Sequence, residues 1–219
     1  MSRIFFTLAF LALALLVGNV LLGLSIGDYN GAQAAVLERV REVRELERER
    51  PRPEARIVEL QAEIDAAFAE LDPIKNFATW HLFLGIAALL VALLVHSIAI
   101  TYFIGTSRWC KEVVETYSLD PALARESARL KRATYPPALL GVAAVLTIGA
   151  LGMAANPGTM QPNTAYWVNP HFFAALAGTA IMAAAFYFEG RNIGANYALI
   201  ERIVAQVQTI RRQRGMEEA

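Results

Sequence analysis

The sequence has few of the residues that most metal and redox sites use: among its 219 residues are one cysteine, Cys110, and three histidines. A single cysteine excludes an internal disulfide and a zinc site built from several cysteines. Charge is also scarce, at 18%, and 20 basic residues balance 20 acidic ones. Soluble domains average about 25% charged residues, so the composition is shifted toward membrane proteins. Zero net charge provides no basic field for nucleic acid, and no nucleic-acid partner is expected.

Long apolar runs are what the sequence does have. Four stretches lack charged residues over about the 20 residues that a helix needs to cross a hydrocarbon core. They are residues 4–26, 77–105, 136–156 and 171–188. A soluble chain of this size would have no core large enough to cover all four. The sequence therefore predicts an all-α polytopic membrane protein with four transmembrane helices and the lipid bilayer as its surroundings.

These runs divide the chain into eight expected segments. The first span, residues 1–26, is expected to be retained, because its apolar run exceeds the roughly 7–15 residues of a signal peptide. Three pairs, Asp72-Pro73, Asp120-Pro121 and Asn169-Pro170, are typical of helix starts, with a capping acceptor before a proline. The remaining segments are an extracytoplasmic helical hairpin (27–72), a second span (73–105), a cytoplasmic helical loop (106–135), a third span (136–156), a short outer loop (157–170), a fourth span (171–190) and a cytoplasmic amphipathic helix with a tail (191–219).

The distribution of basic residues predicts the orientation. Four spans place both termini and the 106–135 loop on one side, and that side holds twelve of the 20 basic residues. The other eight lie between residues 27 and 78, next to twelve acidic residues. Because short cytoplasmic loops are enriched in Lys and Arg, we expect both termini to be cytoplasmic. The expected location is a bacterial inner membrane.

Two charged segments, 33–50 and 54–71, are expected to form the outer hairpin. Each has a narrow apolar seam at helical spacing, and Pro51-Arg52-Pro53 separates them. The seams comprise Val36, Val40, Val43 and Leu46 in the first segment, and Ile57, Leu60, Ile64, Ala67 and Leu71 in the second. Facing seams of this kind are typical of a coiled-coil hairpin. A further apolar stripe runs along 193–214, which we expect to lie on the inner leaflet or to pair with a partner helix.

The histidines are the candidate chemistry. On a helix, His81 and His96 share one stripe of the second span, and His171 opens the fourth span at the level of His81. One hypothesis is a b-type haem held by His81 and His171, with His96 either a second ligand completed by a partner subunit or a hydrogen-bond donor to a quinone. Gly85 and Gly178 would make room for the macrocycle. The alternative is that all three histidines are structural, bonding headgroups, water or neighbouring helices.

The histidine stripe resembles the haem-bearing helices of membrane cytochromes b, over this one helix. Those proteins pair histidines on two helices at both depths, whereas the residue expected opposite His96 is Phe186. No metal is expected apart from haem iron.

No Ser-His-Asp, paired-carboxylate or HExxH arrangement is present, so the sequence offers no basis for an enzyme. We expect a non-catalytic membrane subunit or scaffold that engages a protein partner, or another copy of the chain, through the hairpin and the C-terminal helix. The first alternative is an electron-transfer subunit with haem b or a quinone contact. The second is a signalling protein whose hairpin passes a helix shift to the inner segments.

Overall fold

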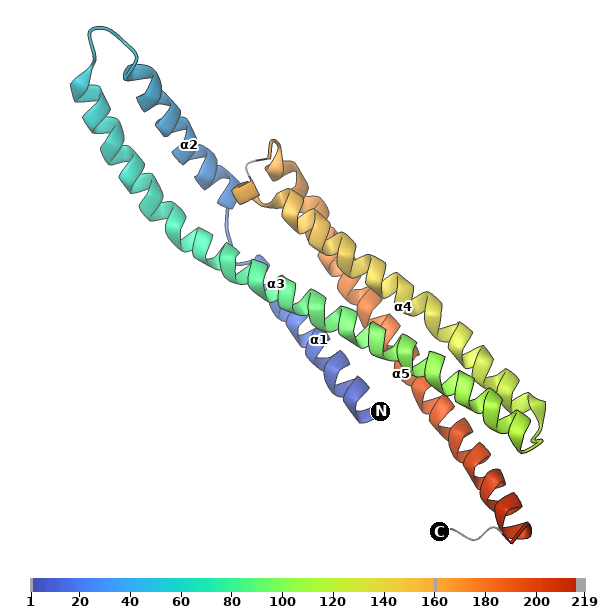
Figure 1. Cartoon of the computed structure of the whole chain (residues 1–219). Helices are drawn as coiled ribbons and strands as arrows, with labels where there is room; N and C mark the ends of the chain where they lie inside the picture. The colour runs from blue at the N-terminus through green and yellow to red at the C-terminus, as the bar shows by residue number, and fades with distance from the viewer. Residues whose placement is uncertain (1, 160, 216–219) are drawn as a thin grey trace. The chain divides into compact units, whose positions relative to one another are not determined.

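The computed structural model describes residues 2–159 and 161–215, and every regular element in these residues is helical. The long helices are α1 (Ser2–Gly23), α2 (Tyr29–Leu46), α3 (Glu54–Thr116), α4 (Pro121–Ala155) and α5 (Val168–Gln213) (Figure 1). Two short 3-10 helices, η1 (Pro157–Thr159) and η2 (Thr164–Trp167), connect α4 to α5. The helices α1, α3 and α4 and the stretch containing α5 are long and apolar enough to cross a membrane. The all-helical prediction is confirmed.

The proline signals predicted some helix starts and not others. Pro121 begins α4, where the Asp120 carboxylate accepts a hydrogen bond from the Ala122 N–H at 2.8 Å. Pro170 lies in the first turn of α5, where backbone N–H groups have no partner within the helix. The predicted start at Asp72-Pro73 is wrong, because Pro73 lies inside the continuous helix α3. Proline's fixed φ suits a helix, so the interruption is confined to one backbone hydrogen bond and its steric contact.

Several expected segment boundaries also fall inside helices. Residues 72/73 and 105/106 lie within α3, 135/136 within α4, and 190/191 within α5. Pro136 and Pro137, which we expected to open the third span, are likewise interior to α4. The boundaries between membrane and extramembrane segments therefore do not coincide with breaks in helical structure. As positions of the membrane surface they stay predictions.

The chain forms two compact units. Unit 1 contains the described parts of residues 1–14, 89–147 and 177–219, and unit 2 contains the described parts of residues 15–88 and 148–176. Each unit combines segments that are far apart in the sequence, because α3, α4 and α5 each contribute one part to each unit.

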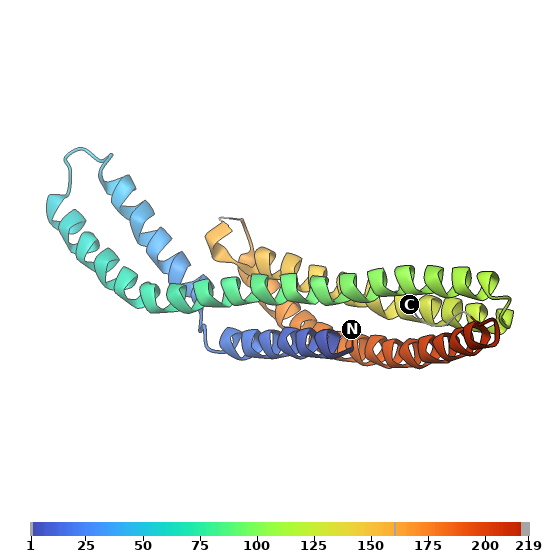
Figure 2. The ribbon, with the colours of Figure 1, turned by 60° about the horizontal axis from the view of Figure 1, so that its bottom comes forward.

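Within unit 2, α2 and the first part of α3 lie side by side (Figures 1 and 2). We call residues 29–71 the charged arm. Its predicted seams face inward: Val36, Ile57, Leu60 and Leu71 are buried. Ion pairs join the two helices at the edges of this seam, with Arg56 3.1 Å from Glu42 and Arg39 3.4 Å from Glu63. Asp28 caps α2 by accepting a hydrogen bond from the N–H of Gly31, which lies in the first turn of this helix.

Unit 1 packs parts of α3, α4 and α5 around an apolar cluster. The cluster takes in Cys110 and Val114 from α3, Leu123 from α4, Leu199 and Ile203 from α5, and Leu119 from the connection between α3 and α4. Ile200, Val207 and Ile210 pack against it. The apolar stripe of 193–214 is therefore covered largely by this chain's own helices. Two residues of the stripe, Tyr197 and Val204, remain exposed, and contact of this face with the inner leaflet or with a partner helix stays a prediction.

Candidate functional site

The rings of His81 and His171 come together in unit 2. Their centroids are 6.0 Å apart, and the ring planes are inclined at 79°. The His81 Nδ1 lies 3.0 Å from the backbone carbonyl oxygen of Asn19 on α1, which fixes one nitrogen of that ring as a donor. The two histidines predicted to lie at one level are thus neighbours.

The packing around these two rings does not fit a porphyrin between them. A Cβ at Gly23 would lie 2.9 Å from His81 Cε1, so the nitrogen-bearing edge of this ring packs against α1. The same edge of His171 packs against Gly152 of α4, where a Cβ would lie 3.0 Å from Cε1. At Gly85, which we expected to make room for a macrocycle, the Asn19 amide fills the space, and a Cβ there would lie 3.0 Å from the Asn19 Nδ2. Haem binding here would require these helices to separate.

In unit 1, His96 of α3 forms a buried pair with Glu189 of α5. The His96 Nδ1 and the Glu189 Oε1 are 2.6 Å apart, and the side chains are 1% and 0% exposed. A separation this short is typical of a hydrogen bond in which one partner is charged or the proton is strongly held. Glu189 points into the helix bundle, whereas Arg191, two residues further along α5, is exposed.

Two other helical residues enclose the His96 ring. Gly141 of α4 lies against it so closely that a Cβ there would be 2.5 Å from His96 Cε1 and nearer still to Nε2. The Phe186 ring lies 5.0 Å away, centroid to centroid, at the position opposite His96 that the sequence predicts. Neither nitrogen of His96 therefore faces an open space that a quinone could enter. Among the described residues, neither the His96 Nε2 nor the Glu189 Oε2 has a hydrogen-bond partner.

Further polar side chains follow the pair along one face of α5. Glu189, Asn192 and Asn196 are spaced by three and four residues, which places them on one side of a helix. The Asn192 Nδ2 donates to the Thr134 Oγ1 of α4 at 3.1 Å. Thr134 is itself buried and donates to the backbone carbonyl of Leu130 at 2.9 Å.

Asn196 of α5 connects its helix to both α3 and α4. Its Nδ2 donates to the Tyr102 hydroxyl oxygen at 3.1 Å and to the Thr106 Oγ1 at 3.0 Å, both on α3. Its Oδ1 accepts from the Ser127 Oγ of α4 at 3.4 Å. We use the name polar ladder for Asn192, Thr134, Asn196, Tyr102, Thr106 and Ser127. Every member has at least one hydrogen-bond partner, which burial in an apolar bundle requires.

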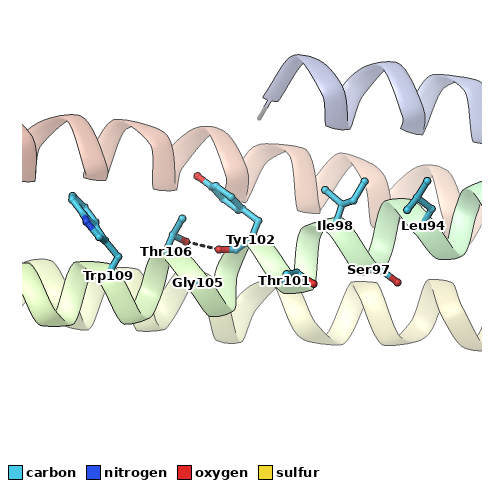
Figure 3. A pocket seen from close by; sticks show the side chains of 8 residues that line it. All are labelled: Leu94, Ser97, Ile98, Thr101, Tyr102, Gly105, Thr106 and Trp109. Atoms are coloured by element: carbon cyan, nitrogen blue, oxygen red, sulfur yellow. Dashed lines mark hydrogen bonds between the residues drawn. The ribbon is translucent and has the colours of Figure 1, made fainter.

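An open groove of about 590 Å³ follows α3 beside the polar ladder. Its lining runs from Leu94 to Trp109, and Figure 3 shows Tyr102 and Trp109 projecting on one side of the helix and Ser97 and Thr101 on the other. All its lining residues belong to α3, so it is a feature of the helix surface and not a chamber between helices.

Cys110 lies next to this region in the apolar cluster of unit 1, and its side chain is buried. Burial raises the pKa of the Cys110 thiol, although a hydrogen bond with Ser127 acts in the opposite direction. A buried, protonated thiol is a poor nucleophile. Cys110 therefore serves as an apolar core residue.

Sequence reasoning identified the three histidines and missed the glutamate that pairs with one of them. A signal was present: Glu189 directly follows an uncharged run, and Asn192 and Asn196 repeat its helical face. An ionisable residue at the end of an apolar run, on a face that continues with amides, is typical of an inward-facing position. In the described residues, no group of three or more His, Cys, Asp or Glu side chains could hold a metal ion.

No family model, curated protein or solved structure matches this chain.

Proposed function

We propose that the chain is an integral membrane protein with four spans, formed by α1 and by the apolar parts of α3, α4 and α5. The supporting observation is the large apolar side chains that these helices expose. Phe10 is 75% exposed, Leu139 61% and Phe173 65%, each within a stretch without charges. Soluble monomers rarely expose large contiguous apolar surfaces, whereas lipid-facing helices do so along their length.

Both termini are proposed to lie in the cytoplasm of a bacterial cell, and the charged arm outside the inner membrane. The support is the excess of basic residues at the proposed cytoplasmic end, together with the lack of charge in the 157–170 connection.

Site-directed labelling tests this orientation. In a Cys110→Ser background, Glu59→Cys should react with a membrane-impermeant maleimide from the periplasmic side. Arg211→Cys should react only after the inner membrane is opened, because it lies beyond the last span. Both introduced positions are exposed, so folding does not limit their reactivity. The reverse pattern, or labelling of both from one side, would contradict the proposal.

The proposed function is that of a non-catalytic membrane subunit or scaffold that engages a protein partner, or another copy of the chain, through the charged arm. The observation that supports this function is that the two helices of the charged arm bury their apolar seams against each other and still expose a further surface of charged and apolar residues. Arg56 of the arm contacts Glu42, Glu59 and Glu63. Val58 and Phe68 are exposed between the charges. Exposed apolar residues rimmed by charge are typical of protein-binding surfaces. The C-terminal helix, packed within unit 1, contributes to docking only through its exposed face.

Replacing residues 33–71 by a short Gly-Ser linker tests the arm as the docking element. In native membranes, a photo-crosslinker at position 58 should give an adduct of defined mass with the full-length chain. A photo-crosslinker on the exposed face of α5 should give an adduct with the same partner in the full-length chain. This adduct should disappear when the charged arm is replaced. A control variant with Arg125→Gln and Arg129→Gln, in the N-terminal part of α4, should retain the complex. A complex that survives loss of the arm would exclude the arm as the docking element.

The second candidate is an electron-transfer subunit that carries b-type haem, and the close packing of His81 and His171 against α1 and α4 weighs against it. Protein purified in mild detergent would then show a reduced-minus-oxidised Soret and α-band, and His81→Ala and His171→Ala would each abolish it. Glu201→Gln, at an exposed position of α5, is the control and should keep both bands. A colourless, fully folded protein from cells supplied with haem would eliminate this candidate.

A further inference from the structure

The His96–Glu189 pair is the buried ionisable group of unit 1 that the proposed function does not use. One polar atom of each side chain takes part in the hydrogen bond between them. The other polar atom of each, His96 Nε2 and Glu189 Oε2, has no hydrogen-bond partner in the described residues. Native proteins leave few buried polar atoms unpaired, so two in one pair require an explanation.

The charge of the pair depends on how many protons it holds. When the imidazole is neutral and the Glu189 carboxyl is ionised, the pair carries a net negative charge among apolar side chains. With two protons added to this state, the pair carries a net positive charge. Either net charge is expensive in apolar surroundings unless a counter-charge is close. Gly141 of α4 and Phe186 of α5 lie against the His96 ring, and Phe5 of α1 packs on Phe186; none of these three residues is ionisable. The pair is neutral when it holds one added proton, which the two residues share.

The surroundings of the pair differ between its two sides along the helix axes. On the N-terminal side of His96 in α3 and of Glu189 in α5, the buried neighbours are apolar: Ala92, Val95, Met182, Ala185 and Phe186. On the C-terminal side of both residues, the polar ladder links α3, α4 and α5 and is accompanied by the buried apolar residues Ala99, Phe103 and Ile193. The hydroxyl and amide groups of the ladder lower the cost of admitting a water molecule or a proton, and apolar packing raises it.

From this geometry we propose that His96 and Glu189 form a proton-binding site inside the helix bundle, and that its single shared proton exchanges with solvent through the polar ladder. The site lies within unit 1 and is independent of the charged arm and its partner. Loss of the arm and loss of the proton site are therefore separable results.

The shared proton is detectable by NMR on the full-length protein in lipid nanodiscs with ¹⁵N-labelled histidine. We expect one far-downfield proton resonance coupled to His96 Nδ1, because a bond of 2.6 Å between these groups strongly deshields its proton. Glu189→Gln should remove the resonance, since an amide cannot share a proton in this way. Glu201→Gln, an exposed position on the same helix, should keep it. Folded wild-type protein without this resonance, or its persistence in Glu189→Gln, would overturn the proposal.

The access route is tested by the rate at which this proton exchanges with water, measured by saturation transfer. Thr134→Val keeps the shape of the side chain and removes the hydroxyl that Asn192 contacts. Exchange should slow several-fold in this variant, while the resonance keeps its position. Thr147→Val, in the same helix but on an exposed position, is the matched control and should leave the rate unchanged. Equal rates in wild type and Thr134→Val would exclude the polar ladder as the route.

Discussion

Replacing His96 by leucine should lower the free energy of unfolding by about 3–5 kcal/mol, the usual effect of breaking a buried pair by removing one partner. The remaining Glu189 side chain, 0% exposed, would have neither its hydrogen bond nor access to water. The measurement is detergent or guanidinium unfolding of the purified protein in micelles, followed by circular dichroism.

The double variant His96→Leu/Glu189→Leu is the control for this prediction. Removing both polar groups eliminates the unpaired carboxyl, so most of the lost stability should return, and buried pairs replaced in this way are often as stable as the originals. A second control is Glu126→Gln, which breaks an exposed ion pair with Arg202 at 2.7 Å. Exposed pairs contribute about 0–1 kcal/mol, so this change should be small. A double variant as unstable as the single one would show that the pair does not act as a unit.

The sequence predicted the helical elements well where composition determines them. Each of the four uncharged runs lies almost entirely within a long helix, because a backbone in apolar surroundings must satisfy its hydrogen bonds within the segment. The apolar seam of the charged arm was also predictable from the sequence, because its apolar residues recur at helical spacing. Two of them, Leu60 and Leu71, are buried.

Continuity of the helices was harder to predict. Asp72-Pro73 has the local features of a helix start, yet α3 runs through it. A capping residue followed by proline is a signal from the first turn of a helix alone. The same pair of residues also occurs inside a long helix when packing stabilises the turns on either side of it. Leu71, buried in unit 2, is such a packed residue directly before this pair.

The candidate site was predictable only in part. His96 was recognisable as an ionisable residue within an apolar run, but its partner lies 93 positions further along the chain. Pairing at that separation depends on which faces of α3 and α5 meet, and this follows from the packing of small residues such as Gly141. Periodicity within one helix does not contain that information.

The second large effect is expected at Gly141, where the α4 backbone packs directly on the His96 ring. Gly141→Ala should cost about 1–3 kcal/mol, the typical range for an added group in a packed core, and should weaken the bond between His96 and Glu189. The reason is steric, because the new Cβ would overlap Cε1 and Nε2 of a ring that is 1% exposed and enclosed by Phe186. Unfolding in micelles gives the stability, and the His96 resonance gives the state of the bond.

Two comparisons isolate this contact from the general effect of changing a glycine. A Cβ at Gly105 or Gly194 would meet nothing within 4 Å. Gly105→Ala and Gly194→Ala should therefore be neutral or stabilising by up to about 1 kcal/mol, because alanine favours the helix more than glycine does. In a His96→Ala background the obstructing ring is gone, so Gly141→Ala should lose its penalty, and the double-mutant cycle should show a coupling free energy close to the whole effect. If Gly141→Ala destabilised the protein equally with and without the His96 ring, the close approach of α4 to this ring would not be what requires glycine at this position.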